Sequence, residues 1–208
     1  MAKWLFFDVG YTLIDETAMW ERRYKETAEM ANKIGKNVTA DDVKAIVMDC
    51  AKKSIPIAPT TAKILGLSDM AKYQGETEVL FDDAKSTLQA LKNKGYKLGV
   101  IANQPENLDG RLKKLGILQY FDEVVSSHDC GVVKPNEKIF LLALSRAGCN
   151  ASEAVMVGDR VDNDIAPAKK LGMQTVRVLQ GICATQQTDA SSEPTYTINK
   201  VSDLLTIF

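Results

Sequence analysis

Five polar residues stand at or just beyond the ends of short apolar segments: Asp8, Asn103, Lys134, Asp159 and Asp164. Asp8 ends WLFFD, Asn103 follows VIA, and Asp159 follows MVG. Lys134 lies in the loop after EVVSS, and Asp164 comes five residues after Asp159. Such apolar runs are typical of buried parallel strands, whose carboxyl ends meet at one edge of a sheet. We therefore expect these five side chains to lie close together.

Three carboxylates and one lysine at one edge form a site with a definite chemistry. Carboxylates in one pocket repel one another, and burial adds to the cost of keeping them charged. A hard cation removes the conflict, and Mg²⁺ suits a site with a few oxygen ligands and remaining waters. The lysine leaves the site near neutral for an anionic group. One acid after a strand is usually part of a turn, but turns do not explain the whole set, which predicts a metal site for an anionic ligand.

The elements that must position these residues alternate between strand and helix patterns from about residue 80 onward. Strands are expected at 96–102, 123–127, 154–158, 173–178 and 196–199. Helices are expected at 82–95, 105–116, 135–148 and 165–172, with a short one near 201–205. Together with an apolar strand at 3–8, this order predicts an α/β fold with a Rossmann-like parallel sheet and helices on both faces.

Residues 16–79 differ, because they read as all helix. Trp20 and Tyr24 begin a row of helical spacing that Gly35 ends, and Thr39 is expected to cap a second helix. Two prolines at 56 and 59 are expected to break the chain before two shorter helical pieces at 61–66 and 68–73. We therefore predict a core of residues 1–15 and 80–208 interrupted by a helical cap of residues 16–79. Within the cap, Trp20 and Tyr24 are expected to pack internally and not to stack on a ligand.

Composition excludes several classes of partner. Lys and Arg total 26 against 27 acids, so no basic face is expected for nucleic acid or a membrane surface. We find no signal-peptide pattern and no apolar run of the roughly 20 residues that a membrane span needs. Four scattered cysteines predict reduced thiols and a cytoplasmic protein. The single histidine, His128, excludes a histidine metal cluster and is expected in a loop or at the surface. The oligomeric state does not follow from the sequence.

Three motifs together resemble those of the haloacid dehalogenase-like hydrolases, most of which are Mg²⁺-dependent phosphatases. DVGYTL at 8–13 is similar to the first motif, GVVKP at 131–135 to the lysine motif, and GDRVDND at 158–164 to the acidic motif. Their order and spacing agree over the core, and a helical cap after the first motif is common in the family. The resemblance implies a Mg²⁺-dependent phosphatase of small phosphorylated metabolites.

The resemblance also implies roles for individual residues. Asp8 would be the nucleophile that forms an aspartyl-phosphate, and Lys134 would hold Asp8 and offset phosphoryl charge. Asn103, Thr12 and Lys134 would contact the substrate, and the cap would close over it. The implied Mg²⁺ ligands are Asp8, the backbone carbonyl of Gly10, Asp159 and Asp164, the last either a ligand or next to the ligands.

Two positions depart from the family pattern. Phosphatases of the family usually carry a second Asp two residues after the nucleophile, which protonates the leaving group and later activates water; here that position is Gly10. The usual Ser or Thr of the second motif is Ala102, with Asn103 as the expected substitute. General acid–base catalysis is typically worth about 10²–10⁴-fold. The sequence therefore predicts weakened hydrolysis that favours acyl and aryl phosphates over sugar phosphates.

Other readings of the same residues remain open. Members that cleave carbon–halogen or carbon–phosphorus bonds also lack the second Asp. Carbon–phosphorus cleavage would need a cap lysine, for which the candidates are Lys33, Lys44, Lys52, Lys53 and Lys63, each expected to be solvated. Gly10 and Ala102 also fit a degenerate member that binds a phosphorylated ligand or protein without turnover. A receiver domain would be half this length, and a dinucleotide enzyme would need G-x-G-x-x-G after the first strand. Arg160 and Asp162 are expected to pair with each other.

Overall fold

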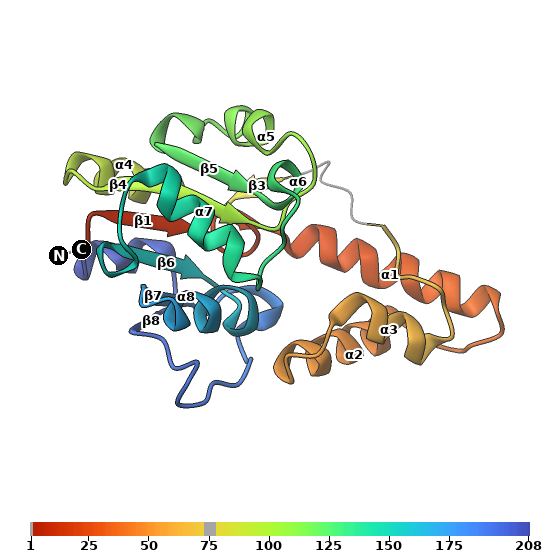
Figure 1. Cartoon of the computed structure of the whole chain (residues 1–208). Coiled ribbons are helices and arrows are strands. Elements are labelled where there is room, and N and C mark those ends of the chain that lie inside the picture. Colours follow the sequence, from red (N-terminus) through yellow and green to blue (C-terminus); the bar gives the residue numbers. More distant parts are fainter. Residues whose placement is uncertain (1, 73–77) are drawn as a thin grey trace.

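The structure is a computed structural model that describes residues 2–72 and 78–208. Its largest element is a six-stranded sheet, in which every neighbouring pair is parallel and the order is β5-β4-β1-β6-β7-β8 (Figure 1). The strands are β1 (Trp4–Phe7), β4 (Lys97–Ala102), β5 (Glu123–Ser126), β6 (Ala154–Gly158), β7 (Gln174–Val178) and β8 (Tyr196–Ile198). This confirms the predicted α/β fold and its Rossmann-like parallel sheet.

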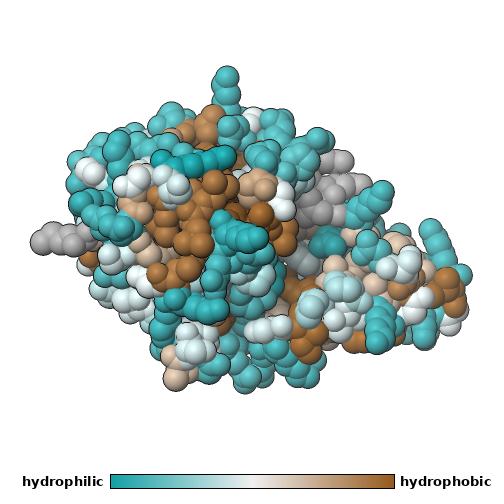
Figure 2. All heavy atoms as spheres, viewed as in Figure 1, coloured by the Kyte–Doolittle hydropathy of each residue, from teal (hydrophilic) through white to brown (hydrophobic). Residues whose placement is uncertain are grey.

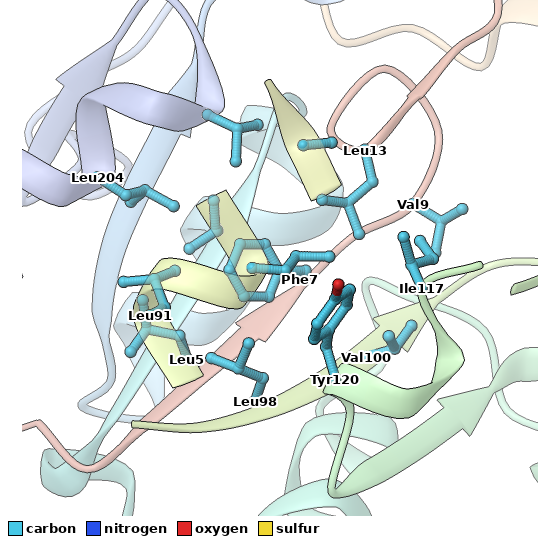
Figure 3. Packing of buried hydrophobic residues seen from close by; sticks show 14 of the residues in the cluster. Leu5, Phe7, Val9, Leu13, Leu91, Leu98, Val100, Ile117, Tyr120 and Leu204 are labelled. Atoms are coloured by element: carbon cyan, nitrogen blue, oxygen red, sulfur yellow. The ribbon is translucent and has the colours of Figure 1, made fainter. Parts of the chain in front are cut away.

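Helices cover both faces of the sheet because β1 is apolar on both sides. Leu5 and Phe7 pack in one buried cluster, whereas Phe6, between them, packs in another on the opposite face. Figure 3 shows Phe7 among the side chains of the first cluster, which include Leu91 and Leu204. Burial of each such side chain stabilises the fold by roughly 1.5–3 kcal/mol.

The first face is covered by α4 (Ala84–Asn93), α5 (Leu108–Lys114) and the 3₁₀ turn Val201–Thr206. The second face is covered by α7 (Glu137–Ala147) and α8 (Ala166–Lys170). A four-residue helix, α6 (Ser127–Cys130), follows β5. The remaining short elements are 3₁₀ turns at Leu118–Tyr120, Ala151–Glu153 and Gly181–Cys183 and a π-helical turn at Val161–Ile165.

A helical layer leaves the core directly after β1 and projects to one side of it (Figure 1). It consists of α1 (Thr17–Lys33), α2 (Ala40–Lys52) and α3 (Ile57–Leu65). An antiparallel pair of two-residue strands, β2 (Ile14–Asp15) and β3 (Val79–Leu80), joins the two ends of this insertion. The helices enclose their own buried cluster, which includes Trp20 and Tyr24. Tyr24 therefore packs internally, as the sequence predicts, whereas Trp20 packs in the same cluster and also lines the cavity described below.

The ends of the cap helices test the local predictions. Thr39 caps α2 through a reciprocal capping box with Asp42, which confirms it as the N-cap. Pro59, however, does not break the chain, because it lies in the first turn of α3, where a missing backbone N–H costs no helical bond. The expected helix at 61–66 therefore begins earlier, at Ile57.

The second expected short helix, at 68–73, is wrong over residues 68–72; residue 73 lies outside the described residues. Side chains of α1 take up backbone groups of this segment. Ala71 donates its N–H to Thr27 Oγ1 at 3.1 Å, and its carbonyl accepts a hydrogen bond from Arg23 Nε at 2.9 Å. Tertiary hydrogen bonds to α1 therefore replace the local helical bonds.

The face of the molecule in Figure 2 agrees with the balanced composition. Figure 2 shows mostly hydrophilic side chains, with hydrophobic ones gathered on the core around the place where α7 lies in Figure 1. His128 is exposed on α6, as expected, and all four cysteines are free thiols. Within residues 2–72 and 78–208, no helix has the length and apolar character to cross a membrane.

Candidate active site

Lys134 joins the ends of several strands at one edge of the sheet. Its ammonium group lies 2.6 Å from Asp8 Oδ1, directly after β1, and 2.5 Å from Asp164 Oδ1, which follows β6. All three side chains are buried. Burial lowers the pKa of Lys134, but the charges of Asp164 and Asp8 outweigh this effect and raise the pKa above its usual value. The Lys134 side chain is therefore a cation. The parallel sheet thus brings these residues together as predicted.

Asp159 completes a cluster of three acids. One carboxylate oxygen from each of Asp8, Asp159 and Asp164 lies within 4.8 Å of the others. Burial, followed by the charges of Asp164 and Asp8, raises the pKa of Asp159 well above its usual range. Burial also raises the pKa of Asp164 to about 6, although Lys134 opposes this shift. One lysine does not compensate three buried carboxylates, and this surplus of oxygen ligands and negative charge fits a hard divalent cation.

The local backbone explains why Asp164 reaches this cluster. It lies in the π-helical turn after β6, where Asp164 Oδ2 accepts a hydrogen bond from the backbone N–H of Arg160 at 3.1 Å. A Cβ atom at Gly158 would lie 2.5 Å from Asp164 Cγ, so only glycine leaves room there. The glycine of the GD pair therefore makes space for the second acid of its own motif.

Asn103 and Thr12 occupy different surroundings. Asn103 binds the Lys134 peptide with both ends of its amide: Nδ2 donates to the Lys134 carbonyl at 2.9 Å, and Oδ1 accepts from the Lys134 N–H at 2.7 Å. Asn103 thus fixes the backbone of the lysine, and it also borders the cavity over the acid cluster. Thr12 is fully buried and has no hydrogen-bond partner for its hydroxyl in the described part of the chain, and it does not line that cavity.

A cavity of about 420 Å³ lies between the sheet edge and the cap. Its floor is formed by Asp8, Gly10, Lys134, Asp159 and Asp164. Apolar side chains from two other segments also line it: Trp20 and Ile57 from the cap, and Ile182 and Cys183 from the turn after β7. Sequence reasoning missed Ile57, Ile182 and Cys183 as lining residues, because no local pattern shows which parts of an insertion and a distant loop face one cavity.

Glu16, which the sequence did not single out, also lines this cavity. It is the residue immediately before α1. Burial, together with the negative charge of Asp8, raises the pKa of Glu16 to about 7. The sequence signal for this residue is weak, because it stands outside every motif.

Basic residues near the site are already paired or face solvent. Arg160 binds Asp162 through two hydrogen bonds, of 3.1 Å and 2.6 Å, as predicted. The five cap lysines considered for carbon–phosphorus chemistry are all exposed, and none lines the cavity: Lys33, Lys44, Lys52, Lys53 and Lys63. Two of them pair with surface acids, Lys44 with Glu21 and Lys53 with Asp49.

Comparison with known proteins shows which family the chain resembles. Residues 5–178 match the family described as haloacid dehalogenase-like hydrolase. Over the whole chain the protein is 32% identical to the glyceraldehyde 3-phosphate phosphatase of Methanocaldococcus jannaschii, of which it covers 97%. It is 30% identical to the enzyme of that name from Pyrococcus abyssi, again over the whole chain and covering 94% of the relative.

Solved structures show the same fold. A phosphatase structure from Thermococcus onnurineus superposes with a TM-score of 0.66 at 26% identity, covering 100% of this chain and 97% of that one. The YfnB hydrolase of Bacillus subtilis, in a magnesium-bound crystal, superposes with a TM-score of 0.70 at 18% identity, covering 99% and 98%. Both superpositions therefore extend over nearly the whole of this chain, including its helical insertion.

Proposed function

Because the chain belongs to the haloacid dehalogenase-like hydrolases and is a phosphatase of that family, we propose that it hydrolyses small phosphorylated metabolites through an aspartyl-phosphate on Asp8. One observation carries this proposal: the carboxylate of Asp8 stands at the cavity floor, bound by a buried lysine and next to two further acids. Lys134 holds one oxygen of Asp8 and leaves the other for attack on phosphorus.

The acid cluster is the proposed Mg²⁺ site, with Asp8, the Gly10 carbonyl, Asp159 and Asp164 as the residues that hold the ion. Bound there, Mg²⁺ supplies positive charge to the phosphoryl oxygens. Lys134 adds a second, fixed positive charge at the same place and costs no reorganisation during the reaction. Asn103 keeps the backbone of Lys134 in position and borders the cavity, and we propose that it helps to arrange the phosphoryl group.

The core and the helical insertion have different roles in this proposal. We propose a catalytic core of residues 1–15 and 80–208 and a cap of residues 16–79, which the β2–β3 pair at the base of the insertion supports. The cap supplies Trp20 and Ile57 to the cavity and excludes water from it. Small metabolite substrates and four free thiols both fit a cytoplasmic enzyme, which is our proposal for its location.

The lining of the cavity favours a small substrate with a neutral leaving group. Outside the acid cluster, its described walls are formed largely by apolar side chains, and Arg160 is already paired with Asp162. A second phosphate group would therefore find no unpaired cation among the described lining residues. Because two relatives over the full chain are named glyceraldehyde 3-phosphate phosphatases, we propose triose phosphates as the substrate class to examine first.

The test is phosphate release from a panel of esters, measured in Mg²⁺ and again in EDTA. The panel contains glyceraldehyde 3-phosphate, glycerol 3-phosphate, fructose 1,6-bisphosphate and p-nitrophenyl phosphate. A separate assay measures chloride release from a 2-chloro acid and tests for dehalogenase activity. We expect the wild type to release phosphate from the monophosphates in Mg²⁺ but not in EDTA. The Asp8→Asn variant should release none, because its amide keeps the shape of the side chain but is not a nucleophile. Chloride release without phosphate release, or full activity in Asp8→Asn, would contradict the proposal. No turnover of any compound would favour a binding protein.

A further inference from the structure

The cavity contains one carboxyl group that does not belong to the acid cluster. Among the described lining residues the carboxylates are Asp8, Glu16, Asp159 and Asp164, and all but Glu16 lie in the cluster beside Lys134. An alkyl phosphate needs a proton for its departing oxygen, and the aspartyl-phosphate needs a base to activate water. We propose that Glu16 is the general acid and base of this enzyme, an inference that rests on the proposed phosphatase function.

The position of the carboxyl group carries the inference. A Cβ atom at Gly10 would lie 2.7 Å from Glu16 Oε1 and 3.1 Å from Glu16 Oε2. The Glu16 carboxyl therefore fills the space into which a side chain at position 10 would point. Gly10 is not among the residues with positive φ, so its backbone does not demand glycine. It is glycine that leaves room for Glu16.

The fold of the loop after β1 delivers Glu16 to this place. The N–H of Tyr11 donates to the carbonyl of Ile14 at 2.8 Å, which turns the chain back on itself. Glu16 then lies between β2 and α1, and its carbonyl accepts the first helical bond, from the Trp20 N–H at 2.9 Å. A residue six positions after Gly10 thus reaches the space beside it.

Other groups in the cavity are less suited to the proton transfer. Lys134 is committed to Asp8 and Asp164, and Arg160 to Asp162. The Asn103 amide is bound to the Lys134 peptide, and an amide does not exchange protons in this range. His128 is exposed on α6 and does not line the cavity.

The proton balance over the two steps is closed. In the first, an Asp8 oxygen attacks phosphorus, the phosphorus–oxygen bond to the leaving group breaks, and its electron pair takes the proton of the Glu16 carboxyl. An alcohol leaves, and Glu16 becomes a carboxylate. In the second, a water oxygen attacks the phosphorus of the aspartyl-phosphate while Glu16 takes a proton from that water. The bond from phosphorus to Asp8 breaks, Asp8 regains its electron pair, and inorganic phosphate leaves.

Glu16→Gln tests the role, because it keeps the shape of the side chain and removes the proton donor. On glycerol 3-phosphate, an alkyl ester, we expect kcat/KM to fall by roughly 10²–10⁴-fold. On p-nitrophenyl phosphate the leaving group needs no proton, so the variant should release a burst of nitrophenolate equal to its active sites and then turn over slowly. Asp15→Asn is the matched control: Asp15 binds the Thr17 N–H beside the same loop but does not line the cavity. It should leave both rates at the wild-type level.

Returning a carboxyl to position 10 provides the rescue. In Gly10→Asp/Glu16→Ala the alanine empties the space that the Glu16 carboxyl fills and the new aspartate can enter it, so alkyl activity should recover relative to Glu16→Ala alone. Wild-type rates in Glu16→Gln, or the absence of a burst in a variant whose circular dichroism is native, would overturn the role of Glu16. If Glu16→Gln does not fold, failure of the folded double variant to regain alkyl activity overturns it instead. If the proposed phosphatase function itself is wrong, the wild type releases no phosphate from either ester. This result differs from every outcome that concerns Glu16 alone.

Discussion

Lys134 compensates more buried charge than any other single residue of the described site. Its side chain is almost inaccessible, and both of its short hydrogen bonds go to carboxylates. A buried ion pair of this kind contributes little net stability when intact, because desolvation offsets the attraction, but removing one partner leaves an uncompensated charge. In the metal-free protein this lysine therefore has a structural role in addition to the catalytic role that we propose.

Lys134→Met should accordingly destabilise the metal-free protein. We expect the free energy of unfolding in EDTA to fall by about 3–5 kcal/mol, the usual result of breaking a buried pair. Lys134→Met/Asp164→Asn removes one of the stranded carboxylates and should recover part of this loss. Urea unfolding of the wild type and both variants makes the measurement. A single variant as stable as the wild type would show that the acids are compensated by some other means.

Sequence predicted the carboxylates and the lysine of this site that belong to motifs and missed the carboxyl group of Glu16, which lies outside them. Asp8, Lys134, Asp159 and Asp164 follow strands, so the geometry of a parallel sheet was enough to bring them together. Gly10 showed only that a side chain was absent. That Glu16 fills the same space depends on how the loop after β1 folds back, which no residue spacing reveals.

Asp122 fixes the start of β4 against α4 and illustrates how the elements are joined. Its carboxylate accepts hydrogen bonds from Lys92 Nζ at 2.6 Å, from Lys97 Nζ at 3.0 Å and from the backbone N–H of Leu98 at 3.0 Å. Partial burial raises the pKa of Asp122, but these hydrogen bonds and the charge of Lys92 outweigh this effect and hold the pKa below its usual value. The carboxylate form is therefore favoured in the folded state.

This shift predicts a pH dependence of stability. A group with a depressed pKa in the folded state stabilises the fold above its unfolded pKa, which is near 3.8 for Asp. That contribution is lost as the pH falls through the lower, folded pKa. Asp122→Asn should thus lower Tm at pH 6, and the difference in Tm from the wild type should shrink progressively as the pH falls below 3.8. An unchanging difference would assign the effect of the substitution to packing.

The strands were predicted more reliably than the short elements. The core strands are nearly continuous apolar runs, and burial on both faces leaves such runs few alternatives. The β2–β3 pair and α6 escaped prediction because two and four residues are too few to show a period. The helix expected at 68–73 is wrong over the described residues 68–72 for a different reason, since Thr27 and Arg23 of α1 bind the backbone of this segment.

At the scale of the whole molecule, the described contacts that attach the cap to the core include two separate segments. One is the β2–β3 pair at the base of the insertion. The other is the segment after β7, where Ile182 and Cys183 pack into the buried cluster of the cap helices. Because both residues also line the cavity, the same segment joins the cap to the core and forms one wall of the proposed active site.

Gln186 provides the polar part of this second attachment. Its Oε1 accepts a hydrogen bond from the Val161 N–H at 2.7 Å, and its Nε2 donates to Asp162 Oδ1 at 2.9 Å and to Ser54 Oγ at 2.8 Å. The first two partners belong to the turn that carries Asp164, whereas Ser54 follows α2 of the cap. One buried amide thus connects the turn that carries Asp164 of the acid cluster with the cap.

The two sides of this connection should differ in energy. Gln186→Ala leaves the buried Val161 N–H without an acceptor, and we expect the free energy of unfolding to fall by about 1–3 kcal/mol. Ser54→Ala removes only the exposed partner, which water can replace, so its cost should stay within about 0.5–1.5 kcal/mol. Adding Ser54→Ala to Gln186→Ala should then cost less than Ser54→Ala alone, because the hydrogen bond is already gone. Urea unfolding of the four proteins gives this coupling as a double-mutant cycle. Fully additive effects would mean that the cap gains no stability from Gln186 and depends on Ile182 and Cys183 for its second attachment.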